Sequence, residues 1–174
     1  RVEKGTRILD YLLSQEIQHP HICYSEILGT VQSCDTCMCE VNGNITRACS
    51  TVVEEGMNIL TSSELAKQAQ EEAMDRVLEN HLLYCTVCDN NNGNCRVHNT
   101  VELMGVEHQT RPHRSKGYEV DMSHPFYRYD ADQCILCGRC VETCQDLQVN
   151  ETLTINWESE QPRVLWDGGK SINE

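Results

Sequence analysis

The spacing of apolar residues predicts a short helix near the start of the chain. In residues 1–16, Lys4 and Gly5 form a turn, and Thr6 is placed to cap the helix that follows. The apolar face repeats at helical spacing and consists of Ile8, Leu9, Leu12 and Leu13. Val2, before the turn, indicates a strand whose hairpin partner is missing. We therefore expect the chain to be a fragment of a longer protein.

The clearest helical pattern covers residues 61–83. Thr61 and Glu64 form a capping box at its start. The apolar positions that recur at helical spacing are Leu65, Ala69, Ala73, Met74, Val77 and Leu78. If the helix continues, steps of four and three residues place three metal-ligating side chains on one side of it: His81, Cys85 and Cys88.

Alternating apolar residues predict two hairpins. Residues 38–41 and 45–48 flank Asn42 and Gly43, a strong signal for a tight two-residue turn. The second hairpin, across a polar turn, uses Leu153, Ile155 and Trp157, followed by Val164 and Trp166. The sequence therefore predicts an α+β fold built from short strands and helices.

The chain has 174 residues and a formal net charge of -13. This acidic balance argues against nucleic acid as a partner, because phosphate binding needs clustered Lys and Arg. It suits either docking to a basic protein or a well-solvated surface. We expect no membrane span, because no apolar stretch is long enough. One basic island either contacts an acidic partner or, as we favour, forms a simple loop: Arg111, His113, Arg114 and Lys116.

Twelve cysteines allow three interpretations: disulfides, zinc and iron–sulfur clusters. Disulfide frameworks belong mainly to short secreted chains. The cysteines here come in tight C-x2-C groups, which metal sites favour. The order of the groups favours iron–sulfur clusters, and a zinc-stapled interaction module is the alternative from another class.

The most specific group is C-x2-C-x2-C-x3-C, formed by Cys134, Cys137, Cys140 and Cys144. This is the bacterial ferredoxin spacing for a [4Fe–4S] cluster, and in two-cluster ferredoxins the fourth cysteine binds the other cluster. Cys144 either completes this quartet or belongs to a further cluster completed beyond residue 174. Gln145 in place of the usual Pro departs from the motif. We favour the further cluster.

A second group supplies four thiols at gaps of ten, two and eleven residues: Cys23, Cys34, Cys37 and Cys49. A loop carrying three cysteines, with a hairpin that returns a fourth, can place two thiolates on each iron of a [2Fe–2S] cluster. The plant-type gap between the first two is four residues, and the longer gap here matches a subclass found in respiratory enzymes. Cys39 shares a strand face with Cys37. We interpret it as a small buried side chain rather than a ligand.

Between these groups lies H-x3-C-x2-C-x6-C, formed by His81, Cys85, Cys88 and Cys95. Three thiolates and one imidazole can bind a [4Fe–4S] cluster, and a neutral His ligand tends to raise its potential. The alternatives are that His81 caps the last carbonyls of its helix or that His98 is the ligand. We favour His81, because the three cysteines otherwise lack a fourth ligand.

In this order, the three groups resemble the N-terminal iron–sulfur region of three families. These are the alpha (catalytic) subunit of molybdopterin-dependent formate dehydrogenases, the large iron–sulfur subunit of respiratory complex I, and multi-cluster [FeFe] hydrogenases. The stretches most similar to Bacillus-type formate dehydrogenases are residues 19–24, 34–38, 81–89 and 132–140. Complex I usually has five residues between the last two cysteines of the His-containing group, and this chain has six.

The resemblance implies four segments. They are a β-grasp [2Fe–2S] ferredoxin-like domain at 1–60, a helical His–Cys [4Fe–4S] domain at 61–100, a linker at 101–130 and an incomplete bacterial-type 4Fe–4S ferredoxin domain at 131–174. Because metal binding and folding are coupled, we expect apo-protein to lose structure past residue 80.

The family also implies a downstream domain in which formate becomes carbon dioxide at molybdenum or tungsten held by pterins. The present chain would then hold no substrate site and would relay electrons to an external acceptor. That acceptor is NAD, through a flavin subunit, or a quinone-linked membrane partner. The expected location is cytoplasmic, including the inner face of a membrane through such a partner. The same relay in a complex I-like NADH dehydrogenase or a hydrogenase is the alternative.

Overall fold

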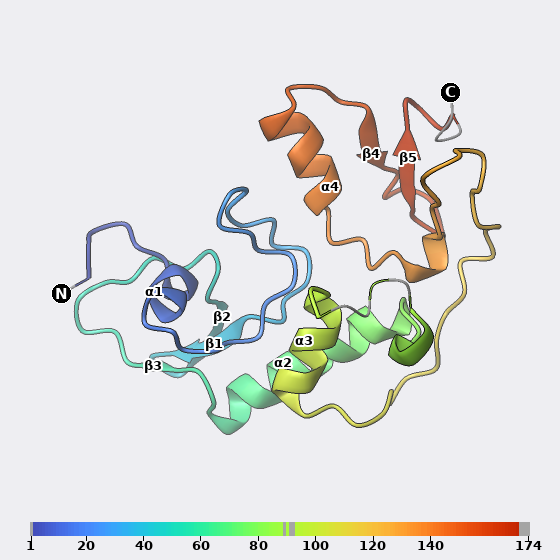
Figure 1. The fold of residues 1–174 in the computed structure, drawn as a ribbon. Helices are drawn as coiled ribbons and strands as arrows, with labels where there is room; N and C mark the ends of the chain where they lie inside the picture. The colour runs from blue at the N-terminus through green and yellow to red at the C-terminus, as the bar shows by residue number, and fades with distance from the viewer. Residues whose placement is uncertain (1, 89, 91–92, 171–174) are drawn as a thin grey trace.

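The computed structural model describes residues 2–88, 90 and 93–170. It is a mixed α and β fold with two small sheets in separate parts of the molecule (Figure 1). In chain order the helices and strands are α1 (Ile8–Ser14), β1 (Met38–Val41), β2 (Asn44–Arg47), β3 (Ile59–Leu60), α2 (Glu64–Glu79), α3 (Arg96–Met104), α4 (Arg139–Glu142), β4 (Leu153–Ile155) and β5 (Val164–Trp166). Short 3₁₀ turns cover Cys85–Val87 and Ala131–Gln133, and α4 continues into a π-helical turn at Thr143–Leu147.

The first predicted hairpin is confirmed. β1 pairs antiparallel with β2, and β3 adds to the other edge of β1, which gives the order β2–β1–β3. Asn42 and Gly43 have φ values of 50° and 84°. Positive φ at both positions is what a type I′ hairpin turn requires.

The predicted apolar face of α1 packs against this sheet, but the helix is not capped as predicted. Its buried residues are Ile8, Leu9 and Leu12. The Thr6 hydroxyl donates to the carbonyl of Glu3 at 2.8 Å, so it closes the preceding turn and does not cap the helix. The first free N–H group of the helix, at Ile8, donates instead to the carbonyl of Thr51 at 2.9 Å. A residue in the loop between β2 and β3 therefore satisfies the N–H group that the sequence assigned to a local cap.

α2 is shorter than predicted at both ends. Its cap is Ser63, whose hydroxyl accepts a hydrogen bond from the N–H of Ala66 at 3.2 Å, so the predicted capping box at Thr61 is wrong. At the other end, the side-chain amide of Asn80 donates to the carbonyl of Arg76 at 3.0 Å. Because the helix stops there, the prediction that it carries His81 and the next two cysteines on one side is also wrong.

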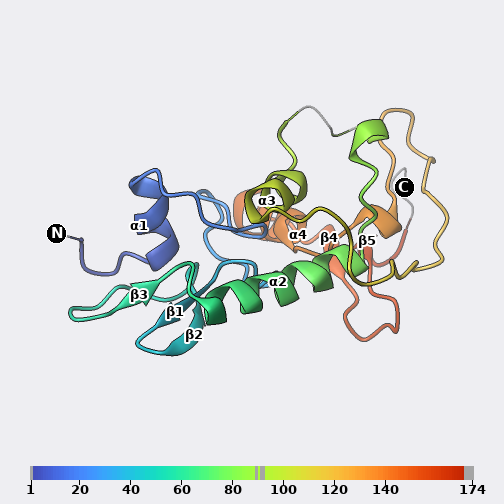
Figure 2. The same ribbon diagram turned by 90° about the horizontal axis from the view of Figure 1, so that it is seen from below.

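The buried face of α2 is rotated from the predicted one. It consists of Ala66, Gln70, Ala73, Met74, Val77 and Leu78. Leu65, which the pattern placed on this face, is 51% exposed. The side-chain amide of Gln70 explains the rotation, because it donates to the carbonyls of Met38 at 2.7 Å and Thr61 at 3.1 Å. These bonds hold α2 alongside the sheet (Figure 2).

α3 has no counterpart among the predicted elements and crosses the boundary predicted at residue 100. It ends at Gly105, whose φ of 67° is the left-handed conformation common after helices. Together with α2 and the loop before β1 it builds a second core, whose buried residues are Ile22, Cys23, Cys34, Met74, Val77, Leu78, Val97 and Val101.

The C-terminal hairpin is confirmed, with β4 and β5 paired antiparallel. Trp157 lies beyond β4 and is 61% exposed, so the predicted alternation stops at Ile155. Among the described residues after 110, the buried apolar side chains are Ala131 and Val164. This part of the chain therefore lacks a hydrophobic core of its own.

The basic island is a loop that folds back onto the chain. Arg111 lies 4.0 Å from a carboxylate oxygen of Asp75 and 3.8 Å from one of Glu79, both on α2. Lys116 is buried. Arg111 is therefore paired with carboxylates of α2, and the ammonium of Lys116 is hydrogen-bonded inside the protein. Over the described ranges, none of the helices has the length and apolar character that crossing a bilayer requires.

Candidate metal centres

The first four predicted ligands are buried together beside the β1–β2 hairpin. The N–H of Ala48 donates to the carbonyl of Cys37 at 3.0 Å, so the hairpin sets Cys37 beside Cys49. The loop before β1 supplies the other two, where the N–H of Cys23 donates to the sulfur of Cys34 at 3.4 Å. The four cysteines thus form two pairs.

In each pair, one thiol donates a hydrogen bond to the other. The Cys23 thiol lowers the pKa of Cys34 while its own pKa rises, and the Cys37 thiol has the same effect on Cys49. The hydroxyl of Thr30 also donates to the sulfur of Cys49, at 3.1 Å. The neighbouring groups therefore favour the thiolate form of Cys34 and of Cys49.

Two thiol pairs are the donor set that a [2Fe–2S] cluster takes, with four cysteines on two irons. Within the described ranges, no three His, Cys, Asp or Glu side chains form a group suited to a single metal ion.

Cys39 lies in the core between α1 and the sheet, where it is fully buried. Burial raises its pKa to about 11, and the nearby charge of Cys49 adds to the effect. These surroundings suit the small apolar side chain that the sequence analysis expected.

Sequence reasoning missed His19 as a supporting residue. Its ring is buried, and Nε2–H donates to the carbonyl of Cys37 at 3.1 Å. Burial lowers its pKa, which keeps the ring neutral. The His-Pro-His segment before Cys23 belongs to a stretch that resembles formate dehydrogenases. It has no ligand spacing that could reveal the role of His19.

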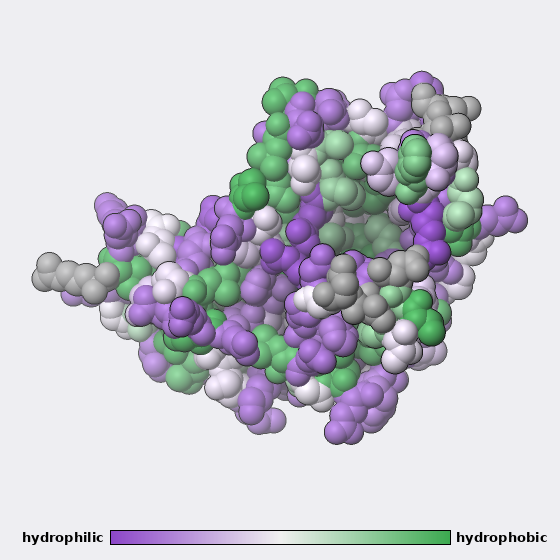
Figure 3. All heavy atoms as spheres, viewed as in Figure 1, coloured by the Kyte–Doolittle hydropathy of each residue, from purple (hydrophilic) through white to green (hydrophobic). Residues whose placement is uncertain are grey.

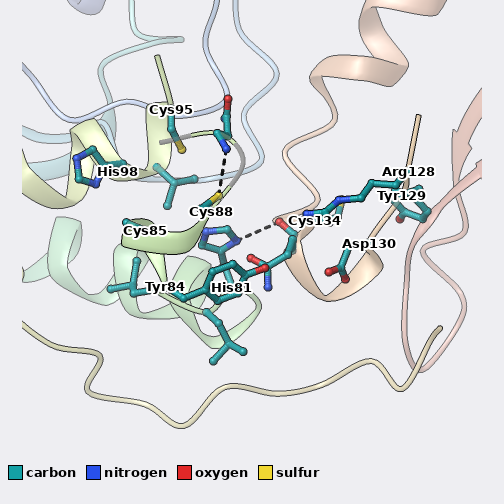
Figure 4. Close-up of a pocket in the computed structure, with 15 residues that line it drawn as sticks. His81, Tyr84, Cys85, Cys88, Cys95, His98, Arg128, Tyr129, Asp130 and Cys134 are labelled. Carbon is teal, nitrogen blue, oxygen red and sulfur yellow. Dashed lines mark hydrogen bonds between the residues drawn. The ribbon is translucent and has the colours of Figure 1, made fainter. Parts of the chain in front are cut away.

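The second predicted set lines one cavity of about 500 Å³. His81 follows α2, Cys85 opens a 3₁₀ turn, Cys88 ends it, and Cys95 precedes α3 (Figure 4). Cys134, from the third set, lines the same cavity. In the space-filling view the surface is hollowed between the C-terminal unit and the segment around α3, with apolar residues inside the hollow (Figure 3).

The ring of His81 has one nitrogen engaged. Nδ1–H donates to the carbonyl of Gln133 at 3.1 Å, so the ring does not cap α2. Burial lowers its pKa, which favours the neutral form that ligates metals. The hydrogen bond at Nδ1 leaves Nε2 available to bind a metal. The rival donor, His98, lines the same cavity, and its Nε2 lies 3.3 Å from a carboxylate oxygen of Glu102.

The third set surrounds the start of α4. Cys134 ends a 3₁₀ turn, Cys140 lies in α4, and Cys144 lies in the π-helical turn beyond it. Burial raises the pKa of Cys137. Cys140 is exposed, and partial desolvation together with the charges of Cys134 and Cys137 raises its pKa to about 11. These three thiols are therefore close enough to interact.

One buried side-chain nitrogen beside this set has no hydrogen-bond partner among the described residues. Within the described part of the chain, no group bonds Nε of Arg139, which lies beside Cys137. A buried N–H is normally satisfied, and an unsatisfied one is destabilising. The sulfides of a bound cluster are anionic acceptors that would satisfy it. The residues present therefore fit a [4Fe–4S] cluster.

Two family models match the chain. Residues 1–64 match the 2Fe-2S iron–sulfur cluster binding domain, and residues 70–110 match the NADH-ubiquinone oxidoreductase-G iron–sulfur binding region. The chain is also 60% identical, over 98% of its length, to the putative formate dehydrogenase YrhE of Bacillus subtilis. It is 54% identical, over 99% of its length, to a putative formate dehydrogenase of Staphylococcus aureus strain USA300. The chain is thus similar to part of these putative formate dehydrogenases, and two of its segments match iron–sulfur binding families.

The chain spans 18% of the length of each of those two relatives. Its fold is similar to that of a solved NAD+-reducing [NiFe]-hydrogenase in the H2-reduced state, with a TM-score of 0.86 at 24% identity. That alignment covers 98% of this chain and 73% of the hydrogenase chain.

The comparisons confirm the resemblance to formate dehydrogenases and the iron–sulfur cofactors of the first two sets. Both family descriptions name iron–sulfur binding, which disfavours the zinc interpretation. The quartet at residues 134–144 lies outside both matched ranges, and the ligand assignments stay predictions.

Proposed function

We propose that this chain is the electron-transfer region of a formate dehydrogenase, an oxidoreductase. One observation carries the proposal. A chain with three predicted ligand sets is 54–60% identical to proteins named putative formate dehydrogenases. Electrons from formate oxidation, at a molybdopterin site outside this chain, would pass through it to an external acceptor.

We assign the ligands set by set. The [2Fe–2S] site uses Cys23, Cys34, Cys37 and Cys49. The first [4Fe–4S] site uses His81, Cys85, Cys88 and Cys95. The second uses Cys134, Cys137, Cys140 and Cys144, the last with the alternative of a further cluster. The bound clusters supply one-electron redox chemistry. The protein positions the thiolates, donates hydrogen bonds to them and excludes water.

The contacts support a relay in which the three sets lie close to one another. Between the first and second sets, the side chain of Arg96, next to Cys95, donates to the carbonyl of Tyr24, next to Cys23, at 2.8 Å. Between the first and third sets, the hydroxyl of Ser33, next to Cys34, donates to the carbonyl of Cys137 at 2.8 Å. Between the second and third sets, His81 donates to the carbonyl of Gln133, next to Cys134.

The whole protein would add a molybdopterin domain and an acceptor subunit linked to flavin and NAD or to a quinone. The four segments at 1–60, 61–100, 101–130 and 131–174 and a β-grasp first domain belong to this proposal, as does a cytoplasmic location. A complex I-like or hydrogenase relay is the second candidate, favoured by the fold similarity to the NAD+-reducing hydrogenase.

The test uses the full-length polypeptide, purified without oxygen. We expect iron and sulfide to account for one [2Fe–2S] and at least two [4Fe–4S] clusters, with anomalous diffraction at the iron edge placing them at the assigned residues. Formate should reduce the clusters. Colourless protein containing zinc would overturn the cofactor assignment. Clusters reduced by NADH or hydrogen but not by formate would favour the second candidate.

A further inference from the structure

Lys116 is buried beside the third ligand set, with only 4% of its surface exposed. Its ammonium donates to the carbonyls of Ala131 at 2.8 Å and Cys134 at 3.0 Å. The loop from α3 to residue 131 therefore delivers a positive charge to the first cysteine of the ferredoxin quartet.

An ammonium group is costly to bury unless an opposite charge compensates it. The two carbonyls supply dipoles but no net charge. The carboxylate of Asp132 is directed elsewhere, because its oxygens accept from the backbone N–H of Lys116 and the hydroxyl of Ser115, each at 2.6 Å.

The charge that best matches Lys116 comes from the thiol set. Burial lowers the pKa of Lys116, and Cys134 is the strongest of the neighbours that oppose this shift, ahead of Asp132 and Asp130. An anionic cluster bound through Cys134 would add to the compensation that Asp132 and Asp130 supply.

We propose that Lys116 is a positioning residue that stabilises the reduced form of the cluster held by the quartet, and so raises its reduction potential. The inference rests on the proposed ligation by Cys134. Reduction adds one electron and no proton to the bound cluster, so its negative charge grows by one. A fixed positive charge nearby stabilises the more negative state by the larger amount.

The same contacts fix the backbone. By holding two carbonyls at residues 131 and 134, the ammonium closes the 3₁₀ turn that presents Cys134. A purely structural role would need only these hydrogen bonds. A change in potential separates the charge effect from that structural role.

The test compares Lys116→Met and Lys116→Arg in the full-length polypeptide with its clusters, by redox titration followed by EPR. We expect Lys116→Met to shift one [4Fe–4S] signal to lower potential and to leave the [2Fe–2S] potential unchanged. Lys116→Arg, which keeps the charge, should recover most of the shift. The control is Lys67→Met, at an exposed position on α2, which should shift nothing.

An unchanged potential in Lys116→Met, with full iron content, would overturn the inference. So would an equal shift in Lys116→Arg. If Lys116→Met loses iron, Lys116→Gln decides, because it keeps N–H donors without the charge: a lowered potential supports the inference and an unchanged one overturns it. Wild-type protein without [4Fe–4S] signals would instead refute the proposed function.

Discussion

The hydroxyl of Ser33 donates a hydrogen bond to the carbonyl of Cys137, 2.8 Å away, across 104 residues of sequence. It joins the loop of the first ligand set to the loop of the third. Close by, Gly138 approaches Val31 so tightly that an added Cβ would lie 3.0 Å from Cγ1 of Val31. Two neighbouring contacts therefore define how these two sets meet.

Gly138→Ala should loosen this junction. Gly138 has a φ of +75°, a conformation that costs an L-residue about 1 kcal/mol. The new methyl group would also press on Val31, whose branched side chain has little rotamer freedom. We expect the local stability to fall by about 2 kcal/mol in total. Amide hydrogen exchange over residues 31–34 and 137–142 should report faster opening.

The control for backbone strain is Gly56→Ala, because Gly56 has a φ of +82° and nothing within 4 Å of the added Cβ. Gly56→Ala should lose only the stability that the strained positive φ costs. Combining Val31→Ala with Gly138→Ala should recover the stability that is lost through the clash with Val31. A double-mutant cycle measures this part of the loss. Equal losses at Gly138 and Gly56 would mean that the contact with Val31 is unimportant.

Gln70→Leu should destabilise the packing of α2 on the first sheet. The side chain is 6% exposed and donates to two backbone carbonyls, those of Met38 and Thr61. Leucine fills the space but leaves both acceptors unsatisfied, a loss of about 1–3 kcal/mol. Urea unfolding followed by circular dichroism should show a lower midpoint. Gln68→Leu, at an exposed position on the same helix, should change little, and a comparable loss there would contradict the explanation.

Features that depend on neighbours in the chain were predictable from the sequence. Asn42 and Gly43 specify their turn because both tolerate positive φ, so the hairpin was predicted to within a residue. Ligand spacing also predicted three sets of ligands, and these sets stay predictions. The predicted cap of α2 was wrong because two candidate caps, Thr61 and Ser63, lie only two residues apart. Long-range hydrogen bonds from Gln70 decide that Ser63 caps the helix.

Features that depend on distant contacts were not predictable. Lys116 occurs in a polar stretch without periodicity, and nothing local indicates that its ammonium is buried against Cys134. The bond from Ser33 to Cys137 has no sequence signal at all. Tertiary contacts of this kind join the loops that carry the three predicted sets, and the sequence alone does not order those sets in space.

His81→Cys should keep a cluster and lower its potential. Replacing a neutral imidazole with a thiolate adds one negative charge, which disfavours further reduction. His81→Ala should lose the cluster from its set. An EPR redox titration measures both effects. The control is His98→Ala, since His98 is engaged with Glu102. A shift in His98→Ala with none in His81→Cys would transfer the ligand role to His98.

Removing iron should unfold the C-terminal part of the chain before the N-terminal part. Residues 111–170, as described, bury only Ala131 and Val164 as apolar side chains. The first unit has a core shared by α1 and the sheet. Units of this size rarely hold a structure without metal or a sufficient core, and metal binding is coupled to folding. In reduced, chelated protein, we expect β4 and β5 to exchange their amides at rates close to those of an unfolded peptide.

β1 and β2 in the same sample provide the internal control. Their amides should stay protected, because their strand pairing rests on a buried apolar face that needs no metal. Restoring iron and sulfide without oxygen should return protection to β4 and β5, since the added cross-links replace the missing core. If β4 and β5 keep full protection without iron, the thiols of the third set are not what holds that part of the chain together, and its stability must come from elsewhere.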